Sequence, residues 1–311
     1  MFALSMKQLR YFDALARLGH FGRAAEDCAI SQPALSMQIK EMEALVGAAL
    51  FERAARQVRL TPLGEAYAGR VRAILRAVDE LEDLARSFQG PLTGRLRLGV
   101  IPTIAPYLLP ALAAELASRW PGLDLLPREA VTGRLIADLA EARLDAAIVA
   151  LPISEPSLTE LPLYSEEFVL IRPEAQAQEQ VPSAARLGEM RLLLLEEGHC
   201  FREQALAFCK PQGSGRTATA RSVMEGSSLS TLVQMVGAGI GVTLVPEMAL
   251  PIETRSARVA LARLPAPAPS RTIGMVWRRS SPLDAPLRSL AERVAAVGLA
   301  GRALAASLCP R

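Results

Sequence analysis

Seven apolar residues within the stretch 67–88 recur at alternating spacings of four and three residues. This heptad pattern is typical of one long α-helix that packs its apolar seam against a second helix. Thr61-Pro62 supplies an N-cap and a first-turn proline before the stretch, and Gly90-Pro91 ends it. We therefore predict a linker helix and hinge over residues 63–93 and dimerisation through the seam. Packing of the seam against the chain's own body is the alternative. The seam consists of Tyr67, Val71, Ile74, Val78, Leu81, Ala85 and Phe88.

The segment before this helix, 1–62, has the pattern of a helix-turn-helix. A helical stripe over 6–18 stops at Gly19, and a short alanine-rich helix is expected at 23–29. The next helix opens at Ser31-Gln32-Pro33, where Ser31 or Gln32 can act as the cap and proline suits the first turn. We predict that this helix lies in the major groove of double-stranded DNA; a solvated polar face is the alternative. Its inward stripe is Leu35, Ile39 and Met42, and its candidate DNA-contacting residues are Gln32, Pro33, Ser36, Gln38 and Lys40.

Two short apolar runs, 50–53 and 58–61, predict a β-hairpin wing after these helices. Three arginines along the wing, Arg53, Arg56 and Arg59, are placed to contact phosphates. Residues 1–62 hold eight Lys and Arg against six Asp and Glu, an excess of +2, and the whole chain has a net charge of +3. DNA binding would therefore depend on local geometry and be sensitive to salt.

The segment 94–311 alternates strand and helix patterns, which predicts an α/β fold with a parallel sheet. We expect two lobes joined by two connections, one formed by about 94–166 plus 268–300 and the other by 167–267, in a cleft-and-hinge layout like that of periplasmic binding domains. Thr103 and Thr132 each follow a predicted strand and open a helix, where a small polar ligand can be held. The tail, with Cys309, is expected to be exposed.

The stretch Gly198 to Cys209 contains two of the four cysteines and one of the two histidines, directly after a predicted strand at 191–195. If Cys200 and Cys209 lie on one helix, their Cα atoms are roughly 13 Å apart, because each residue rises about 1.5 Å. A disulfide requires about 4.4–6.8 Å, so bridging this pair would unwind the segment. Two unrelated buried thiols are the alternative interpretation.

The four cysteines show neither the spacing of a disulfide framework nor that of a structural zinc site, so we predict no metal and no cofactor. Cys28 is expected in the core of the helical domain. The sequence shows no apolar run long enough to span a membrane and no signal-peptide layout at its start, so we expect a cytoplasmic protein.

The first ninety residues resemble the LysR-type transcriptional regulators. The motifs that carry the resemblance are Gly19-His20-Phe21-Gly22-Arg23-Ala24-Ala25, Ser31-Gln32-Pro33-Ala34-Leu35-Ser36, Leu50-Phe51-Glu52-Arg53 and Leu60-Thr61-Pro62-Leu63-Gly64. The resemblance implies a winged helix-turn-helix that binds promoter DNA, a linker-helix dimer, and a two-lobed effector domain assembled as a homotetramer, a dimer of dimers.

A narrower resemblance, to the peroxide-sensing members of that family, extends along the whole chain. It is carried by 101–110, 129–132, 193–206 and 271–274. It implies that Cys200 is the peroxidatic cysteine and Cys209 the resolving one, and that a thiol reductant such as glutaredoxin or thioredoxin resets the pair. It also implies hydrogen peroxide as the ligand. The residues expected around the peroxide are Thr103, Thr132, His199, Arg202, Glu203 and Arg271.

A LysR-type regulator of another kind is the main alternative. In it, Thr103, Thr132 and Arg271 would hold a small organic anion in the cleft while both thiols stay inert. A thiol peroxidase would keep the chemistry of Cys200 but would have no need of a DNA-binding domain. We therefore expect a regulator of antioxidant genes and not an enzyme.

Overall fold

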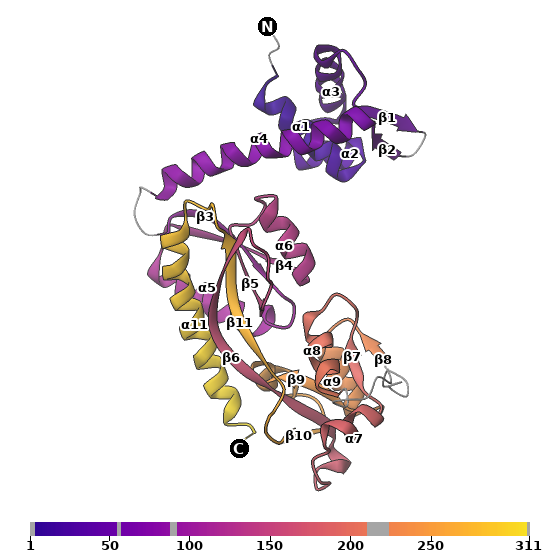
Figure 1. Cartoon of the computed structure of the whole chain (residues 1–311), viewed down its shortest axis with the longest axis vertical. Coiled ribbons are helices and arrows are strands. Elements are labelled where there is room, and N and C mark those ends of the chain that lie inside the picture. The colour runs from indigo at the N-terminus through magenta and orange to yellow at the C-terminus, as the bar shows by residue number, and fades with distance from the viewer. Residues whose placement is uncertain (1–3, 55–56, 88–91, 210–223, 310–311) are drawn as a thin grey trace. The chain divides into compact units, whose positions relative to one another are not determined.

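The computed structural model describes residues 4–54, 57–87, 92–209 and 224–309, with only the backbone described at 53–54, 57, 80, 82–87 and 209. Contacts divide the chain into two units, Met1–Ala85 and Arg86–Arg311 (Figure 1). The first unit is helical with a small hairpin. The second contains a mixed seven-stranded sheet and a separate two-stranded sheet. Among the described residues, no helix combines the length and apolar character needed to span a bilayer.

The helices of the first unit begin and end at local signals in the sequence. Gly19 ends the first helix with a φ of 61°, and the Ser31 hydroxyl accepts the N–H of Ala34 at the start of the third. The second helix starts at Phe21, two residues earlier than expected, because Nδ1 of His20 accepts backbone N–H groups and caps it. The elements are α1 (Met6–Leu18), α2 (Phe21–Asp27), α3 (Gln32–Val46), β1 (Phe51–Ala54), β2 (Gln57–Leu60) and α4 (Pro62–Ser87).

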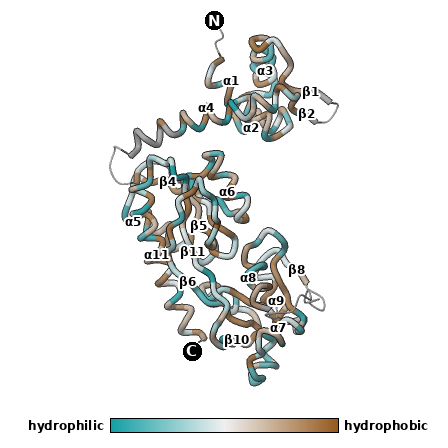
Figure 2. The backbone as a smooth tube through the Cα atoms, in the orientation of Figure 1, coloured by the Kyte–Doolittle hydropathy of each residue, from teal (hydrophilic) through white to brown (hydrophobic). Residues whose placement is uncertain are grey.

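The long helix α4 divides its apolar seam between two environments. Val71 is buried, and Tyr67 packs against the core of the helical domain, so the first part of the seam follows the alternative interpretation. Ile74 and Leu81, further along, are 47% and 65% exposed. The alternating colours of α4 in Figure 2 reflect this two-sided composition. Phe88 lies outside the described residues, and dimerisation through the later part of the seam stays a prediction.

Replacing Gly64 with alanine is expected to destabilise the first unit by about 1–3 kcal/mol, the usual cost of overpacking. A Cβ at this position of α4 would lie 2.1 Å from the backbone oxygen of Leu50, which has little freedom to move. Calorimetric unfolding measures the effect, and tryptophan fluorescence should be unchanged because Trp120 and Trp277 both lie in the second unit.

Gly69, on the same helix, is the matched control. A Cβ there meets no atom within 4 Å, so Gly69→Ala should stabilise the unit by about 0.5–1 kcal/mol through helix propensity alone. Equal effects of the two substitutions would contradict the predicted clash at Gly64.

The main sheet of the second unit has the strand order β10-β6-β11-β5-β3-β4, and β9 also pairs with β6. The strands β3, β4 and β5 are parallel to one another, whereas β6 and β11 are antiparallel to their neighbours. The strands of this sheet are β3 (Gly94–Val100), β4 (Leu123–Glu129), β5 (Ala146–Leu151), β6 (Leu158–Pro173), β9 (Thr243–Pro246), β10 (Val259–Arg263) and β11 (Ser270–Arg278).

The long strand β6 links two hydrophobic cores. Its first part pairs with β11 as far as Glu167, and its second part pairs with β9 and β10 from Phe168 onward. Tyr164 belongs to the core packed around α5 (Ala105–Arg119), α6 (Thr132–Ala140) and α11 (Asp284–Ala306). Phe168 belongs to the core of the other lobe. Only the apolar run 168–171 predicts a strand from the sequence, because the polar first part of β6 lacks such a run.

The second lobe also contains the separate two-stranded sheet, β7 (Leu193–Leu195) and β8 (Met224–Gly226). The stretch 217–221, whose sequence favours a further strand of this lobe, lies outside the described residues. Cys309 was expected to be exposed, and this expectation is wrong: its side chain is buried in the core of the second lobe, and its carbonyl accepts the Nε–H of Arg263 at 2.6 Å. The helices of this lobe are α7 (Ala184–Glu189), α8 (Cys200–Cys209), α9 (Leu229–Gly237) and α10 (Leu250–Glu253), with short 3₁₀ turns at Glu174–Gln176 and Glu247–Ala249.

Candidate functional site

Two threonines follow the carboxyl ends of neighbouring parallel strands. Val100, the last residue of β3, pairs with Glu129, the last residue of β4. Thr103 is buried just after β3, and Thr132 is the first residue of α6, just after β4. The hydroxyl oxygen of Thr132 is buried and has no hydrogen-bond partner among the described atoms. This edge of the sheet, where parallel-sheet proteins bind ligands, therefore has uncommitted hydrogen-bonding capacity.

The fully buried guanidinium of Arg271 connects Thr103 with Glu166 next to this edge of the sheet. It donates to the hydroxyl oxygen of Thr103 at 2.7 Å and to the Thr103 carbonyl at 3.0 Å. It also forms a hydrogen-bonded ion pair with Glu166, whose side chain is equally buried, at 2.8–2.9 Å. The other carboxylate oxygen of Glu166 accepts the N–H of Met248. Arg271 therefore has its charge compensated inside the protein, and the Thr103 hydroxyl hydrogen is left to donate to a ligand.

The helix α8 starts at Cys200, where the two lobes meet. Cys200 is half-buried and packs against the core of the first lobe, whereas Phe201 is buried in the core of the second. The Phe201 ring also lies against Arg271, with 5.7 Å from its centroid to the guanidinium carbon. Gly198 has a φ of 94°, and a Cβ there would lie 3.9 Å from Val131, the N-cap residue of α6. The segment leading into Cys200 therefore lies beside the start of α6, next to Thr132.

His199 is placed to stay neutral near pH 7. Burial lowers the pKa of its imidazole from the ordinary value, and the carboxylates of Glu196 and Glu129 oppose that shift only in part. Gly198, the residue before His199, lies beside Val131, so His199 is close in the chain to the same sheet edge as Thr132. A neutral imidazole next to Cys200 in the chain can accept the proton of a thiol.

Arg202 and Glu203, two of the residues expected around the ligand, form no hydrogen bond or ion pair with Thr103 or Arg271 among the described atoms. The guanidinium of Arg202 donates to the Leu195 carbonyl at 2.9 Å and pairs with Glu225 at 2.9 Å, so it fastens α8 to the β7–β8 sheet. Glu203 is exposed in the first turn of α8. Contact of these two residues with the ligand stays a prediction. For Cys209 only the backbone is described, and it ends the continuous helix α8.

Two further residues at the junction, Glu166 and Tyr107, were not predicted as site residues. Glu166 is one of three acidic residues in β6, and its partner Arg271 lies 105 residues away. Tyr107 packs against both cores, and its hydroxyl donates to Glu253 at 2.6 Å. Burial, together with this hydrogen bond, raises the pKa of Tyr107 well above its ordinary range. Only the fold brings these partners together, so no local signal could have found them.

The candidate DNA-contacting residues of α3 do not all share one face. Gln32, Pro33 and Lys40 are exposed and Ser36 is half-buried. Gln38 donates to Glu41, and it is separated from Lys40 by roughly 160° around the axis, since each residue turns the helix by about 100°. Gln38 therefore lies on the opposite flank from Ser36 and Lys40. On the hairpin, Arg59 is exposed opposite Glu52, the side chain of Arg53 is not described, and Arg56 lies outside the described residues.

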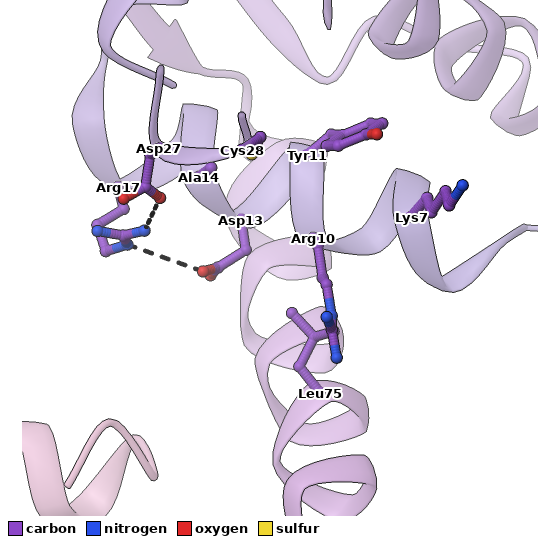
Figure 3. A pocket seen from close by; sticks show the side chains of 9 residues that line it. All are labelled: Lys7, Arg10, Tyr11, Asp13, Ala14, Arg17, Asp27, Cys28 and Leu75. Atoms are coloured by element: carbon purple, nitrogen blue, oxygen red, sulfur yellow. Dashed lines mark hydrogen bonds and ion pairs between the residues drawn. The ribbon is translucent and has the colours of Figure 1, made fainter. Parts of the chain in front are cut away.

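The thiol of Cys28 lies in a different setting from Cys200. It is half-buried at the end of α2 and borders a groove of about 430 Å³ between α1, α2 and α4. Figure 3 shows Arg17 in this groove, bridging Asp13 and Asp27. Burial raises the pKa of Cys28, and Asp27 adds to the shift. Burial likewise raises the pKa of Cys309. Both thiols are therefore poor nucleophiles near pH 7. Among the described residues, no cluster of three or more metal-ligating side chains is present.

The chain matches two protein families along most of its length. Residues 6–65 match the bacterial regulatory helix-turn-helix protein, lysR family, and residues 89–298 match the LysR substrate binding domain. The second match alone covers more than half of the 311 residues. The protein therefore belongs to the LysR family of DNA-binding transcriptional regulators.

Its relatives include named peroxide-responsive regulators. A probable hydrogen peroxide-inducible genes activator from Streptomyces viridosporus is 43% identical over 291 residues, covering 92% of each chain. The DNA-binding transcriptional dual regulator OxyR of Escherichia coli (strain K12) is 39% identical, covering 94% of this chain and 95% of its own. The structure of a full-length OxyR variant from Pseudomonas aeruginosa is 34% identical, with a TM-score of 0.73 and coverage of 94% and 95%. The chain is thus similar to OxyR proteins over nearly its whole length.

Proposed function

We propose that this protein is a transcriptional regulator that senses hydrogen peroxide through Cys200. The observation that carries the proposal is the position of Cys200 at the first turn of α8, at the junction of the two lobes, with Cys209 at the other end of the same continuous helix. Their Cα atoms are roughly 13 Å apart at about 1.5 Å per residue. A disulfide between them would require α8 to unwind.

The chemistry requires only the peroxide and the two thiols. The Cys200 thiolate attacks one peroxide oxygen, the O–O bond breaks, and hydroxide leaves and is protonated to water, so that the sulfur becomes a sulfenic acid. The Cys209 thiolate then attacks that sulfur, the S–O bond breaks, and hydroxide leaves and is protonated to water as the disulfide forms. Neutral His199 accepts the Cys200 proton at the start. A dithiol reductant such as glutaredoxin or thioredoxin returns two electrons and resets the pair.

The charge balance of the site favours a neutral peroxide over a small organic anion. An anion would need an uncompensated cation, but the Arg271 guanidinium is already paired with Glu166 and hydrogen-bonded to Thr103. A peroxide molecule needs only hydroxyl donors and acceptors, and Thr103 and Thr132 both have such capacity. The relative from Corynebacterium glutamicum whose structure contains bound hydrogen peroxide is 35% identical and covers 98% of this chain, with a TM-score of 0.67, which supports the same ligand.

The proposed signal passes from α8 to the DNA. Unwinding α8 removes Phe201 from the core of the second lobe and from the face of Arg271, so the lobes, which have the hinge layout of periplasmic binding domains, change their packing. The assembly is a homotetramer, a dimer of dimers, in which α4 joins the two chains of each dimer. The change in lobe packing repositions the helix-turn-helix units on promoter DNA and so controls antioxidant genes. Gln32, Pro33, Ser36 and Lys40 contact the DNA from α3, and the hairpin residues Arg53, Arg56 and Arg59 contact its backbone.

Thiol counting tests the redox step. The reduced chain has four cysteines, and one equivalent of hydrogen peroxide should leave two thiols titratable after denaturation. Cys200→Ser should lose none of its remaining thiols under the same treatment. Cys28→Ser is the matched control, and it should still lose two, because Cys28 takes no part. A wild-type chain that keeps all four thiols, or a Cys200→Ser chain that still loses two, would overturn the proposal. A DNA footprint that is identical before and after oxidation would instead overturn the coupling.

A further inference from the structure

A second cavity lies in the second lobe, away from Cys200. It has a volume of about 540 Å³, within the range of small-molecule sites. It is bounded by the end of β6, the 3₁₀ turn at Glu174–Gln176, and the start of α7, in the lower part of the second unit in Figure 1. None of the residues that line it belongs to the site around Cys200 and Arg271.

The cavity wall contains a buried arginine without an acidic partner. Arg172 is only 6% exposed, and its guanidinium donates to the carbonyl oxygens of Ala177 and Glu179, both at 2.9 Å. Its Nε is buried without an acceptor, and no described carboxylate forms an ion pair with it. The side-chain oxygen of Gln176 in the same wall is buried and also lacks a partner. Two residues of the same cavity wall therefore each have a buried polar atom, one donor and one acceptor, without a partner among the described atoms.

The charge of Arg172 is the unusual feature. A buried cation is costly unless it is paired, and two backbone carbonyls compensate a full charge only in part. By contrast, Arg271, at the lobe junction, has the fully buried Glu166 as its partner. Of the described residues that line the cavity, only Glu179 is acidic, and it is exposed. Arg186 adds a second cation at the mouth, where it pairs with Glu189 outside the lining.

We infer that this cavity binds a small organic carboxylate with a short apolar body. A guanidinium matches a carboxylate in geometry and charge, and Arg172 has three N–H donors left of its five. Five of the eleven residues that line the cavity are apolar, and they would contact the body of the ligand. Gln176 would accept a hydrogen bond from a hydroxyl or amino group on that body. The apolar part of the wall is Leu170, Val181, Pro182, Met190 and Pro265.

An NMR titration of the reduced full-length chain with hexanoate tests the inference. Saturable binding at one site is expected, weakened about tenfold or more in Arg172→Lys, since a charged hydrogen bond is lost. Arg186→Gln should also weaken binding, and because Arg186 is largely exposed this variant should fold normally. Glu189→Gln is the matched control: it frees Arg186 and should leave binding intact or tighten it.

Several outcomes would overturn the inference. These are no saturable binding of hexanoate, binding that is unchanged in both Arg172→Lys and Arg186→Gln, or binding that is instead lost in Thr132→Val, which would place the ligand between the lobes. Inorganic sulfate that binds as tightly as hexanoate, with the same dependence on Arg172, would overturn the assignment to an organic carboxylate. The peroxide-driven loss of two thiols should persist in Arg186→Gln, so the two proposals fail separately.

Discussion

Replacing Glu166 with glutamine is expected to destabilise the second unit by about 3–5 kcal/mol, the cost of leaving one member of a buried ion pair uncompensated. Both the Glu166 and the Arg271 side chains are fully buried, and the pair is 2.8 Å apart. Glutamine preserves the shape of the side chain but removes the charge that balances the guanidinium. Urea unfolding followed by tryptophan fluorescence measures the effect, because Trp120 and Trp277 both lie in this unit.

The neighbouring residue provides a matched control. Glu167 pairs with Arg263 at 3.1 Å, its side chain is 33% exposed, and Arg263 keeps Glu247 as a second partner. Glu167→Gln should therefore cost about 1 kcal/mol or less. Equal losses in Glu166→Gln and Glu167→Gln would show that burial of the pair does not determine the effect.

Glu166→Gln should also slow the oxidation of Cys200 by hydrogen peroxide. Arg271 holds the hydroxyl oxygen of Thr103 and lies against Phe201, the residue after Cys200. In Glu166→Gln the Arg271 guanidinium loses its ion pair and is therefore held less firmly beside Thr103 and Phe201. The rate of thiol loss at limiting peroxide should fall in Glu166→Gln and stay near the wild-type value in Glu167→Gln. A Glu166→Gln chain that is destabilised but reacts at the wild-type rate would limit Glu166 to a structural role.

The parts of the fold that sequence analysis predicted well are those with local signals. Ser31 and Pro33 define the start of α3, and Gly19 defines the end of α1. These signals act over a few residues and do not depend on the rest of the chain. In contrast, β6 extends over sixteen residues, because its polar first part is held by β11 about a hundred residues later. No local pattern contains that information.

The same distinction applies to the candidate site. Thr103 and Thr132 were predicted from their places after strands, and the roles of Cys200 and Arg271 from a resemblance to a family. The structure joins Thr103 to Arg271 by a hydrogen bond and places Gly198, two residues before Cys200, beside Val131. Arg202 has the right charge and position in the sequence, but its side chain is directed to the β7–β8 sheet by Leu195 and Glu225. The buried partner Glu166 was missed because its role exists only once β6 and β11 are paired.

For Cys309, the prediction from the sequence was wrong. A cysteine three residues from the end of α11 looked exposed, yet the tail returns it to the core of the second lobe, where Arg263 binds its carbonyl.

Oxidation of the reduced protein should remove the hydrogen-exchange protection of α8. In the structure described here, α8 is continuous from Cys200 to Cys209, so its later amide groups bond to carbonyls one turn earlier. The disulfide needs Cα atoms about 4.4–6.8 Å apart, and a helix holds them at roughly twice that separation or more. Exchange measured by mass spectrometry should therefore show amides near the end of α8 exchanging at close to the rate of an unstructured segment after one equivalent of peroxide.

Two controls separate this unwinding from general damage by oxidation. The helix α9, which lies in the same lobe and contains no cysteine, should keep its protection, because its buried residues do not depend on the disulfide. Cys209→Ser should lose the Cys200 thiol to sulfenic acid and still keep α8 protected, since no bridge can form. If oxidised wild-type protein loses two thiols while α8 remains as protected as before, the disulfide does not join Cys200 to Cys209 and the proposed switch is wrong. If α8 loses its protection equally in Cys209→Ser, oxidation of Cys200 alone is the signal, because removing a single thiol from its contact with the first lobe would then be enough to release the helix.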